Sequence, residues 1–309
     1  MIITPQTIKA LFTNFRQEFQ GALTVAPSAW NQVAMMVPSS TRTNTYGFLG
    51  QFPQLREWVG ERVIKDMAAQ SYAIENKTYE STVGISRDDM EDDNLGIYSP
   101  MVQEMGRAAG VFPDENLVFP LFDKGFTTAC YDGQNFFDTE HPVYANTDGT
   151  GSVTSVSNYT AGPTDGDGNP TNPRWYLLDM SRALKPFIYQ RREAPNFTQM
   201  TGMTDEAVFM ENQFRMGVRA RGNGGFGLWQ LAHACDLELT PDNFRTVYDR
   251  MRTVKADGGR PLGINPTLLV CPPELEKQAE QILKIDTLAG GGGNPNYNKA
   301  DVLSTVWLG

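Results

Sequence analysis

Cysteine and long apolar runs are scarce in this sequence, and each shortage excludes a class of protein. The three cysteines, Cys130, Cys235 and Cys271, are odd in number and widely spaced. This fits buried thiols in a reducing compartment and not a disulfide framework. No apolar run approaches the ~20 residues of a membrane span. The first residues lack a basic segment followed by an apolar one, so we expect no secretion signal and no membrane partner.

Positive charge is also in short supply. Lys and Arg number 26 against 36 Asp and Glu, which gives a net charge of −10 over 309 residues. A protein that binds nucleic acid tightly neutralises its phosphates with clustered Lys and Arg. The excess of acidic residues therefore argues against a tightly bound nucleic-acid coat. It leaves open a protein that encloses nucleic acid without gripping it.

Motifs of catalysis and cofactor binding are absent or incomplete. GNGGFG at 222–227 matches a dinucleotide-binding pattern, but strand-like text follows it where a helix is required. DGDGN at 165–169 begins like a calcium loop and then lacks its glycine and its closing glutamate. The two histidines, His141 and His233, stand far apart without a metal-binding motif around them. We therefore expect no enzyme, no metal site and no cofactor.

Residues 4–21 carry the clearest helical pattern. Thr4 is a candidate N-cap, Pro5 occupies the first helical position, and Gly21 is expected to end the helix. Apolar residues at helical spacing form one stripe along it: Ile8, Leu11, Phe12, Phe15 and Phe19. The stripe packs either on the chain's own core or, as an arm, on another subunit. We take its five residues as candidates for the subunit interface and expect a chain without residues 1–20 to be soluble but to assemble poorly.

Residues 46–86 predict a long hairpin, with an outgoing strand near 55–66 and a returning strand near 71–86. The alternation of apolar and polar residues from Tyr79 to Ile85 has the period of a strand. A projecting hairpin is marginal in water, so its apolar groups need a partner surface. Trp58 is the candidate anchor, since buried aromatics dominate interface energies. The predicted subunit-interface residues of this segment are Arg56, Trp58, Glu61, Arg62, Val63, Ile64 and Tyr72.

A kinked helix is predicted over about 97–125. Its apolar face includes Met105 and Phe112, while Pro113 and Pro120 should kink or interrupt it. Ser86 is a candidate N-cap for a short helix ahead of it.

The second half of the chain contains two different sequence patterns. Residues 174–232 contain short apolar pieces between turn residues and predict strands. From Thr240 onward the order helix, strand, helix, strand predicts an α/β unit, with strands at 266–271 and 302–308.

Four long blocks carry a resemblance to a known family. They are NTYGFLGQFPQLREWVGER (44–62), NKTYESTVGISRDDMEDDNLGIYSPMVQEMGRAA (76–109), CYDGQNFFDTEHPV (130–143) and DGGRPLGINPTLLVCPPELEKQAEQIL (257–283). The chain resembles the T-type major head subunit of Mu-like bacteriophages over essentially its whole length.

The resemblance implies an α+β protein with the Hong Kong 97-type capsid fold. The implied parts are an N-terminal arm (1–45), an extended loop (46–86), a peripheral domain (87–235) with a spine helix at about 97–125, and an axial domain (236–309) with an α/β unit and a closing strand. Pentamers and hexamers of such subunits tile an icosahedral shell around double-stranded DNA.

The implied partners are other copies of this chain and the portal, scaffolding and decoration proteins of the phage head. The implied location is the virion, after assembly in the host cytoplasm. The alternative is another phage structural component, such as a tail or decoration protein. Because family-like text begins at residue 4, we expect little or no cleavage at the N-terminus.

One departure from the family concerns the order of segments. In many proteins of this fold the axial α/β unit precedes the last peripheral strands, whereas here the strand-rich block 174–232 comes before the α/β unit. Either the segments are permuted, or the assignment of one block is wrong.

Overall fold

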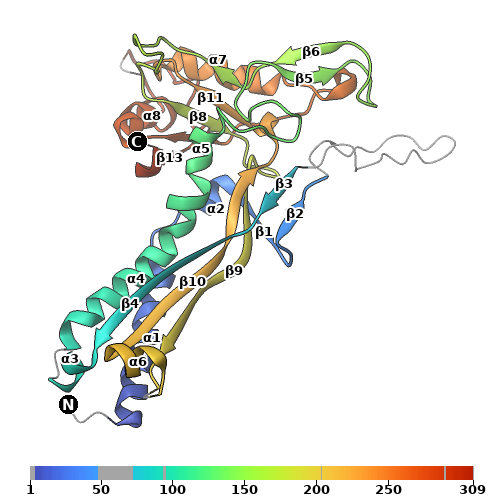
Figure 1. Cartoon of the computed structure of the whole chain (residues 1–309). Coiled ribbons are helices and arrows are strands. Elements are labelled where there is room, and N and C mark those ends of the chain that lie inside the picture. The colour runs from blue at the N-terminus through green and yellow to red at the C-terminus, as the bar shows by residue number, and fades with distance from the viewer. Residues whose placement is uncertain (1–3, 48–71, 93–94, 203, 289, 309) are drawn as a thin grey trace.

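The structure, a computed structural model, describes residues 4–47, 72–92, 95–202, 204–288 and 290–308. Figure 1 shows an elongated molecule with a narrow end built on one sheet and a broader end built on another. A long helical run joins the two ends. In the described part of the chain, no helix is both long and apolar enough to cross a bilayer.

The narrow end is a four-stranded sheet covered by two helices. Its strand order is β1 (Ala34–Pro38), β9 (Phe187–Met200), β10 (Gln213–Phe226) and β4 (Lys77–Ser86). β1 runs parallel to β9, and the other neighbours are antiparallel. The helices α1 (Pro5–Val25) and α4 (Tyr98–Phe112) share one apolar core with β4, β9 and β10 (Figure 1).

The N-terminal helix begins where the sequence predicts. The Thr4 hydroxyl accepts a hydrogen bond from the backbone N–H of Thr7, and the Thr7 side chain caps the Thr4 N–H in return. The predicted end at Gly21 is wrong, because the helix continues to Val25. A glycine lowers helix stability by only about 1 kcal/mol, which packing on α4 can offset.

The predicted kinked helix is confirmed as a run of three parts. α4 passes into a π-helical turn (Pro113–Val118), which leads to α5 (Pro120–Lys124). Both prolines stand at the first position of a new part, where the missing N–H costs least. Ahead of the run, Ser86 caps α3 (Arg87–Glu91) as predicted, and a 3₁₀ turn (Leu95–Ile97) follows.

The prediction of a hairpin over 46–86 is wrong for its returning strand. Residues 77–86 pair with β10 along their whole length, so they are part of a sheet and not half of a projecting hairpin. β10 offers these residues a pairing edge of matching length, which periodicity within 46–86 could not reveal. Two shorter strands, β2 (Thr43–Thr45) and β3 (Ala73–Glu75), pair with each other in antiparallel orientation.

The broad end is a five-stranded sheet flanked by helices. Its strand order is β13 (Asp301–Ser304), β12 (Leu268–Cys271), β8 (Trp175–Leu178), β11 (Ala232–Cys235) and β7 (Tyr159–Thr160). Its longer helices are α7 (Pro241–Arg252) and α8 (Glu276–Leu283). Thr240 caps α7 as predicted. A hairpin of β5 (His141–Tyr144) and β6 (Val153–Val156) lies at the edge of this end (Figure 1).

The predicted division between 87–235 and 236–309 does not separate two sheets. β8 lies between β12 and β11, so one sheet contains strands from both sides of that boundary. The block 174–232 is itself split: β9 and β10 leave the broad end after β8 and the chain returns at β11. Of the two alternatives for the segment order, the wrong assignment of one block is the one that the structure supports.

Two short helices complete the fold. α2 (Trp30–Val33) joins α1 to β1, and α6 (Glu206–Glu211) lies at the tip of the β9–β10 hairpin. The sequence predicted a strand at α6, and its six residues are instead helical. This short apolar segment lies between two long strands, so its composition alone did not distinguish it from them.

Candidate assembly surfaces

The apolar stripe of α1 faces the chain's own core. Ile8, Phe12, Phe15 and Phe19 are each 3% exposed or less, and Leu11 is half-buried against the same cluster. The Phe12 ring lies 6.2 Å from that of Phe214 in β10. The structure therefore has the first of the two alternatives. An interface role for these side chains would require α1 to leave α4.

Two glycines of α4 let α1 approach closely. A Cβ on Gly106 would lie 2.4 Å from the backbone oxygen of Phe19, and one on Gly110 would lie 2.4 Å from the Cβ of Ala26. Real Cβ atoms do not come that close to other atoms, so the crossing of the two helices depends on these glycines.

The described ends of the predicted extended loop are held together by a buried amide. The Tyr46 hydroxyl donates to Gln190 Oε1 at 2.7 Å. The Gln190 amide donates in turn to the Ile74 carbonyl at 3.0 Å and to Asn76 Oδ1 at 2.9 Å. Burial raises the pKa of Tyr46 to about 12. Residues on both sides of the loop are thus bonded to one side chain of β9.

Tyr72, the one described interface candidate of that loop, also makes contacts within the chain. Its hydroxyl accepts a hydrogen bond from the Phe226 N–H at 3.0 Å, and its carbonyl accepts one from the Tyr46 N–H at 2.7 Å. Burial raises the pKa of Tyr72 as well. The remaining candidates lie outside the described residues and stay predictions: Arg56, Trp58, Glu61, Arg62, Val63 and Ile64.

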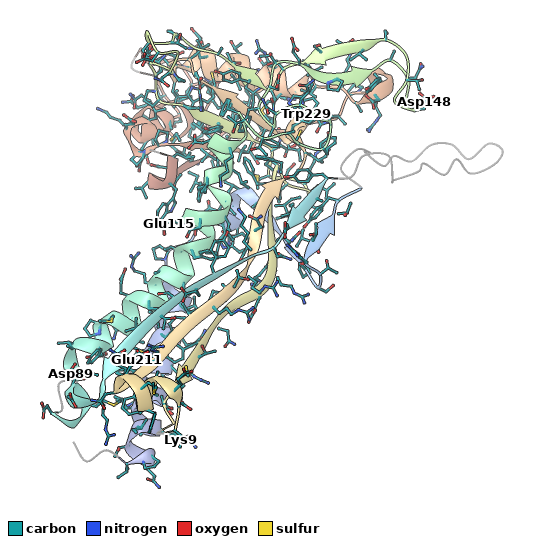
Figure 2. All side chains as sticks on the ribbon, viewed as in Figure 1. Lys9, Asp89, Glu115, Asp148, Glu211 and Trp229 are labelled. Carbon is teal, nitrogen blue, oxygen red and sulfur yellow. The ribbon has the colours of Figure 1, made fainter. Side chains whose placement is uncertain are left out.

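The most exposed large apolar side chain of the described chain belongs to α6. Phe209 is 80% exposed and Met210 is 71% exposed, while Ala207 and Val208 of the same helix are buried. α6, whose last residue is the labelled Glu211, lies at the narrow end (Figure 2). This surface was not predicted from the sequence. The sequence feature that could have indicated it is the pair of adjacent large apolar residues, Phe209 and Met210. Two adjacent residues of a short helix point in different directions, so they cannot both face one core.

The broad end has exposed apolar groups of its own. They lie after α8 and after β13: Ile285, Leu288, Tyr297 and Val306. The two apolar surfaces are therefore at opposite ends of the molecule (Figure 1).

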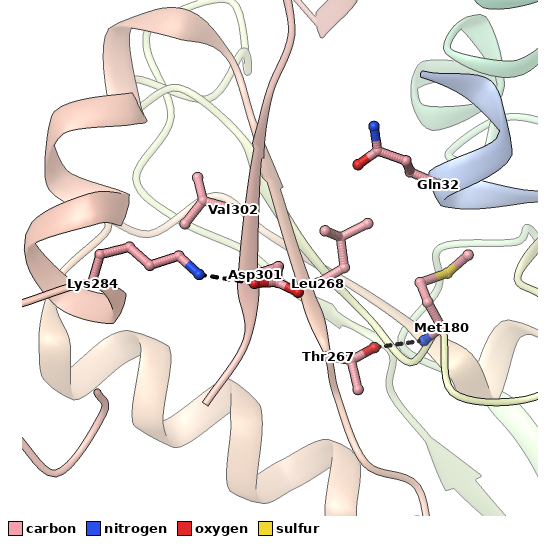
Figure 3. A pocket seen from close by; sticks show the side chains of 7 residues that line it. All are labelled: Gln32, Met180, Thr267, Leu268, Lys284, Asp301 and Val302. Carbon is pink, nitrogen blue, oxygen red and sulfur yellow. Dashed lines mark hydrogen bonds and ion pairs between the residues drawn. The ribbon is translucent and has the colours of Figure 1, made fainter. Parts of the chain in front are cut away.

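A pocket of about 430 Å³ lies beside β12 and β13 (Figure 3). Two interactions join groups of its lining: Lys284 Nζ lies 2.8 Å from Asp301 Oδ1, and Thr267 Oγ1 accepts from the Met180 N–H at 3.0 Å. The side chains that line it include no nucleophile beside a base, so they offer no catalytic arrangement.

Three potential metal ligands meet inside the broad end. Cys130, Asp132 and His141 bring their ligand atoms within 4.8 Å of one another. His141 Nδ1 lies 2.7 Å from Asp132 Oδ2, and its ring stacks on Trp229 at 4.0 Å. Histidine 233, by contrast, is bonded to Thr160, and burial lowers its pKa to about 3. No common metal-binding spacing within 130–143 indicates this cluster in the sequence.

The chain matches the family model of the Mu-like prophage major head subunit gpT over residues 8–308. It is 54% identical to the major capsid protein of Escherichia phage Mu, over 94% of this chain and 93% of that protein. It is 48% identical to the Mu-like prophage FluMu major head subunit of Haemophilus influenzae, over 94% and 92% of the two chains.

Solved capsid structures have the same fold. A chain from the procapsid of bacteriophage JBD30 gives a TM-score of 0.85 at 58% identity, with 99% of this chain and all of that chain covered. A chain from the JBD30 capsid gives a TM-score of 0.73 at 44% identity, with both chains fully covered.

Proposed function

Because the chain belongs to the Mu-like gpT family of major head subunits, we propose that it assembles as pentamers and hexamers into an icosahedral shell that encloses double-stranded DNA. It is a major capsid protein of a Mu-like phage with the Hong Kong 97-type fold, a virion component and not an enzyme. The observation that carries the proposal is the likeness to the JBD30 procapsid chain over the whole length of both chains.

The two ends of the molecule take different places in the proposed shell. The five-stranded sheet with α7 and α8 is the axial domain, which surrounds the symmetry axes of the capsomers. The four-stranded sheet with α1 and α4 is the peripheral domain, and α4 continues through the π-helical turn as the spine helix. This replaces the division at residue 235, because each proposed domain now contains a complete sheet.

The segment between Tyr46 and Tyr72 is the proposed extended loop. Its two described ends are fixed to Gln190, so the loop leaves the subunit from a defined position. In the proposed shell it lies across the adjacent subunit of the same capsomer, and Trp58 anchors it.

Trp58→Ala tests this proposal. We expect a loss of about 2 kcal/mol or more per contact at such an anchor, seen as lower shell yield and a lower melting temperature of the shell. The unassembled subunit should melt as the wild type does. Equal losses in the subunit and the shell would make Trp58 a core residue and would end the extended-loop assignment.

The tip of α6 is a second proposed contact with another copy of this chain. A chain that assembles with itself buries apolar surface between copies, and Phe209 and Met210 are two adjacent, strongly exposed apolar groups at the narrow end. Their neighbours Glu206 and Glu211 supply a polar rim.

Portal and scaffolding proteins are further proposed partners. A decoration protein is another, since the JBD30 capsid has been solved decorated with minor capsid protein trimers, and a chain of that capsid is 42% identical to this one. The match to capsid chains over full length favours the capsid role above the alternative of a tail or decoration protein.

Expression of the full chain, followed by size-exclusion chromatography and negative-stain microscopy, tests the proposed assembly. We expect capsomers or closed shells. A compact monomer at all concentrations, with or without the phage's scaffolding protein, would contradict the proposal. A ligand-dependent rise in melting temperature of that monomer would favour an enzyme instead.

A further inference from the structure

We infer that Cys130, Asp132 and His141 form a zinc site inside the broad end of the subunit. Cys130 and Asp132 lie in the segment between α5 and β5, and His141 is the first residue of β5. The thiol sulfur lies 3.1 Å from Asp132 Oδ1, and His141 Nδ1 lies 2.7 Å from Asp132 Oδ2. The side chain of His141 is fully buried and that of Asp132 is 6% exposed. A thiolate, an imidazole and a carboxylate are the donor types that zinc takes in proteins.

Asn158 fixes how the histidine ring presents its nitrogens. Its Nδ2 donates to the Phe136 carbonyl at 2.7 Å, and its Oδ1 accepts from the Asp138 N–H at 2.9 Å. These bonds set the orientation of the amide, so Oδ1 faces His141 Nε2 at 3.2 Å. Nε2 therefore carries a proton. This is the outer hydrogen bond that commonly orients a metal-binding histidine.

The other ring nitrogen then needs a positive group beside it. With its proton on Nε2, a neutral imidazole has a bare lone pair at Nδ1, and that lone pair points at the Asp132 carboxylate across 2.7 Å. Two electron pairs at this distance require a proton or a cation between them. Zinc fills this position when it binds Nδ1, Asp132 and the Cys130 sulfur together.

The bound site is neutral in charge. Zinc takes a thiolate and a neutral imidazole, so any proton on Cys130 Sγ or His141 Nδ1 is released to solvent when the metal binds. The two positive charges of zinc then balance the Cys130 thiolate and the Asp132 carboxylate. A neutral sum matters because an uncompensated charge is costly in a buried place.

The geometry needs only small movements. Around a tetrahedral zinc ion the ligand atoms lie about 3.4–3.6 Å apart, so the 3.1 Å sulfur–carboxylate contact must widen by about 0.3–0.5 Å and the 2.7 Å histidine–carboxylate contact by about 0.7–0.9 Å. The second oxygen of Asp132 or a water molecule would be the fourth ligand of the zinc ion. The stacked Trp229 ring and the Asn158 amide cover the histidine and limit access of solvent.

Metal content and cobalt spectroscopy test the site. The full chain is expressed in minimal medium with zinc or with cobalt, purified without chelator and dialysed against metal-free buffer. We expect about one ion per chain, and the cobalt form should show a thiolate-to-cobalt charge-transfer band in the near ultraviolet. The same preparation is made for Cys130→Ser, and for Cys235→Ser and Cys271→Ser as matched controls with buried thiols outside the cluster.

Cys130→Ser should lose the band, while both control variants keep it. Asn158→Ala should retain the ligands and bind zinc about 10–100-fold more weakly. Less than a tenth of an ion per wild-type chain from both media would overturn the inference. So would a cobalt band that survives in Cys130→Ser but is lost in Cys271→Ser. Because the wild-type content decides by itself, a variant that fails to fold leaves the test intact.

Discussion

The helices α1 and α6 both reach the narrow end of the molecule, and they use apolar side chains in opposite ways (Figure 1). α1 spaces its apolar residues by three and four, so that Phe12 and Phe19 face one core and are 1% exposed or less. α6 carries Phe209 and Met210 next to each other, and both are strongly exposed. Spacing therefore separates a stripe that is buried in the fold of the subunit from an apolar surface that remains exposed.

The largest expected effect tests the buried side of this comparison. Phe12→Ala removes a fully buried ring between α1 and β10, and should lower the free energy of unfolding of the subunit by about 3–5 kcal/mol. Gln17→Ala, on the exposed face of the same helix, is the control and should change little. The measurement is denaturant unfolding of unassembled subunit.

This result would also correct our expectation for the arm. A stripe that docks on a neighbour predicts a stable, assembly-deficient subunit after Phe12→Ala or after deletion of residues 1–20. A stripe in the core predicts an unstable subunit. If Phe12→Ala leaves the subunit intact and abolishes only shells, the core assignment fails.

The next effect concerns the crossing of α1 and α4. Gly106→Ala forces a Cβ against the Phe19 carbonyl and should cost about 1–3 kcal/mol, because one helix must shift. Gly21→Ala is the matched control, since nothing lies within 4 Å of the added atom. It should raise stability by about 0.5–1 kcal/mol. Thermal melting of both variants decides, and a stable Gly106→Ala subunit would argue against the close crossing.

A smaller effect is expected where the predicted loop joins the subunit. Tyr46→Phe removes the hydroxyl that donates to Gln190 and should cost about 1–2 kcal/mol, because Gln190 Oε1 is left buried without that donor.

The same variant has a signature in its pH dependence. The pKa of Tyr46 is raised from about 10 in the unfolded chain to about 12, so the folded state favours the protonated phenol. Its contribution is fully present below pH 10 and is lost as the pH rises toward 12. The stability difference between wild type and Tyr46→Phe, measured by urea unfolding, should shrink over that window. A difference that stays constant from pH 9 to pH 12 would refute the raised pKa.

The smallest effect on the subunit is expected at α6. Phe209→Ala removes a ring that is 80% exposed, so the subunit should unfold as the wild type does, within about 0.5 kcal/mol. Shell yield should fall, because the ring is a proposed contact between copies. Normal shell yield would remove α6 from the assembly surface.

Local features of this fold could be predicted from the sequence, and partners distant in the chain could not. The caps at Thr4, Ser86 and Thr240 and the prolines of the spine helix act within a few residues, and all are confirmed. The pairing of β4 with β10 joins segments about 130 residues apart, as Ile85 opposite Phe214 illustrates. No period within either strand specifies the other, so the hairpin over 46–86 was the simpler and wrong prediction.

The candidate sites divide in the same way. The stripe of α1 was found from its spacing, but its partner was undecided until α4 and the sheet were placed. The cluster of Cys130, Asp132 and His141 lies within one short segment, yet its spacing matches no common metal motif. Only the turn after α5 brings the three side chains together.

A cryo-electron microscopy reconstruction of particles assembled from this chain tests the account most directly. We expect a closed shell of pentamers and hexamers in which the five-stranded sheets surround the symmetry axes and α1 of each subunit covers α4 of its own chain. A shell in which α1 lies on a neighbouring subunit, or particles without capsomers, would contradict the account.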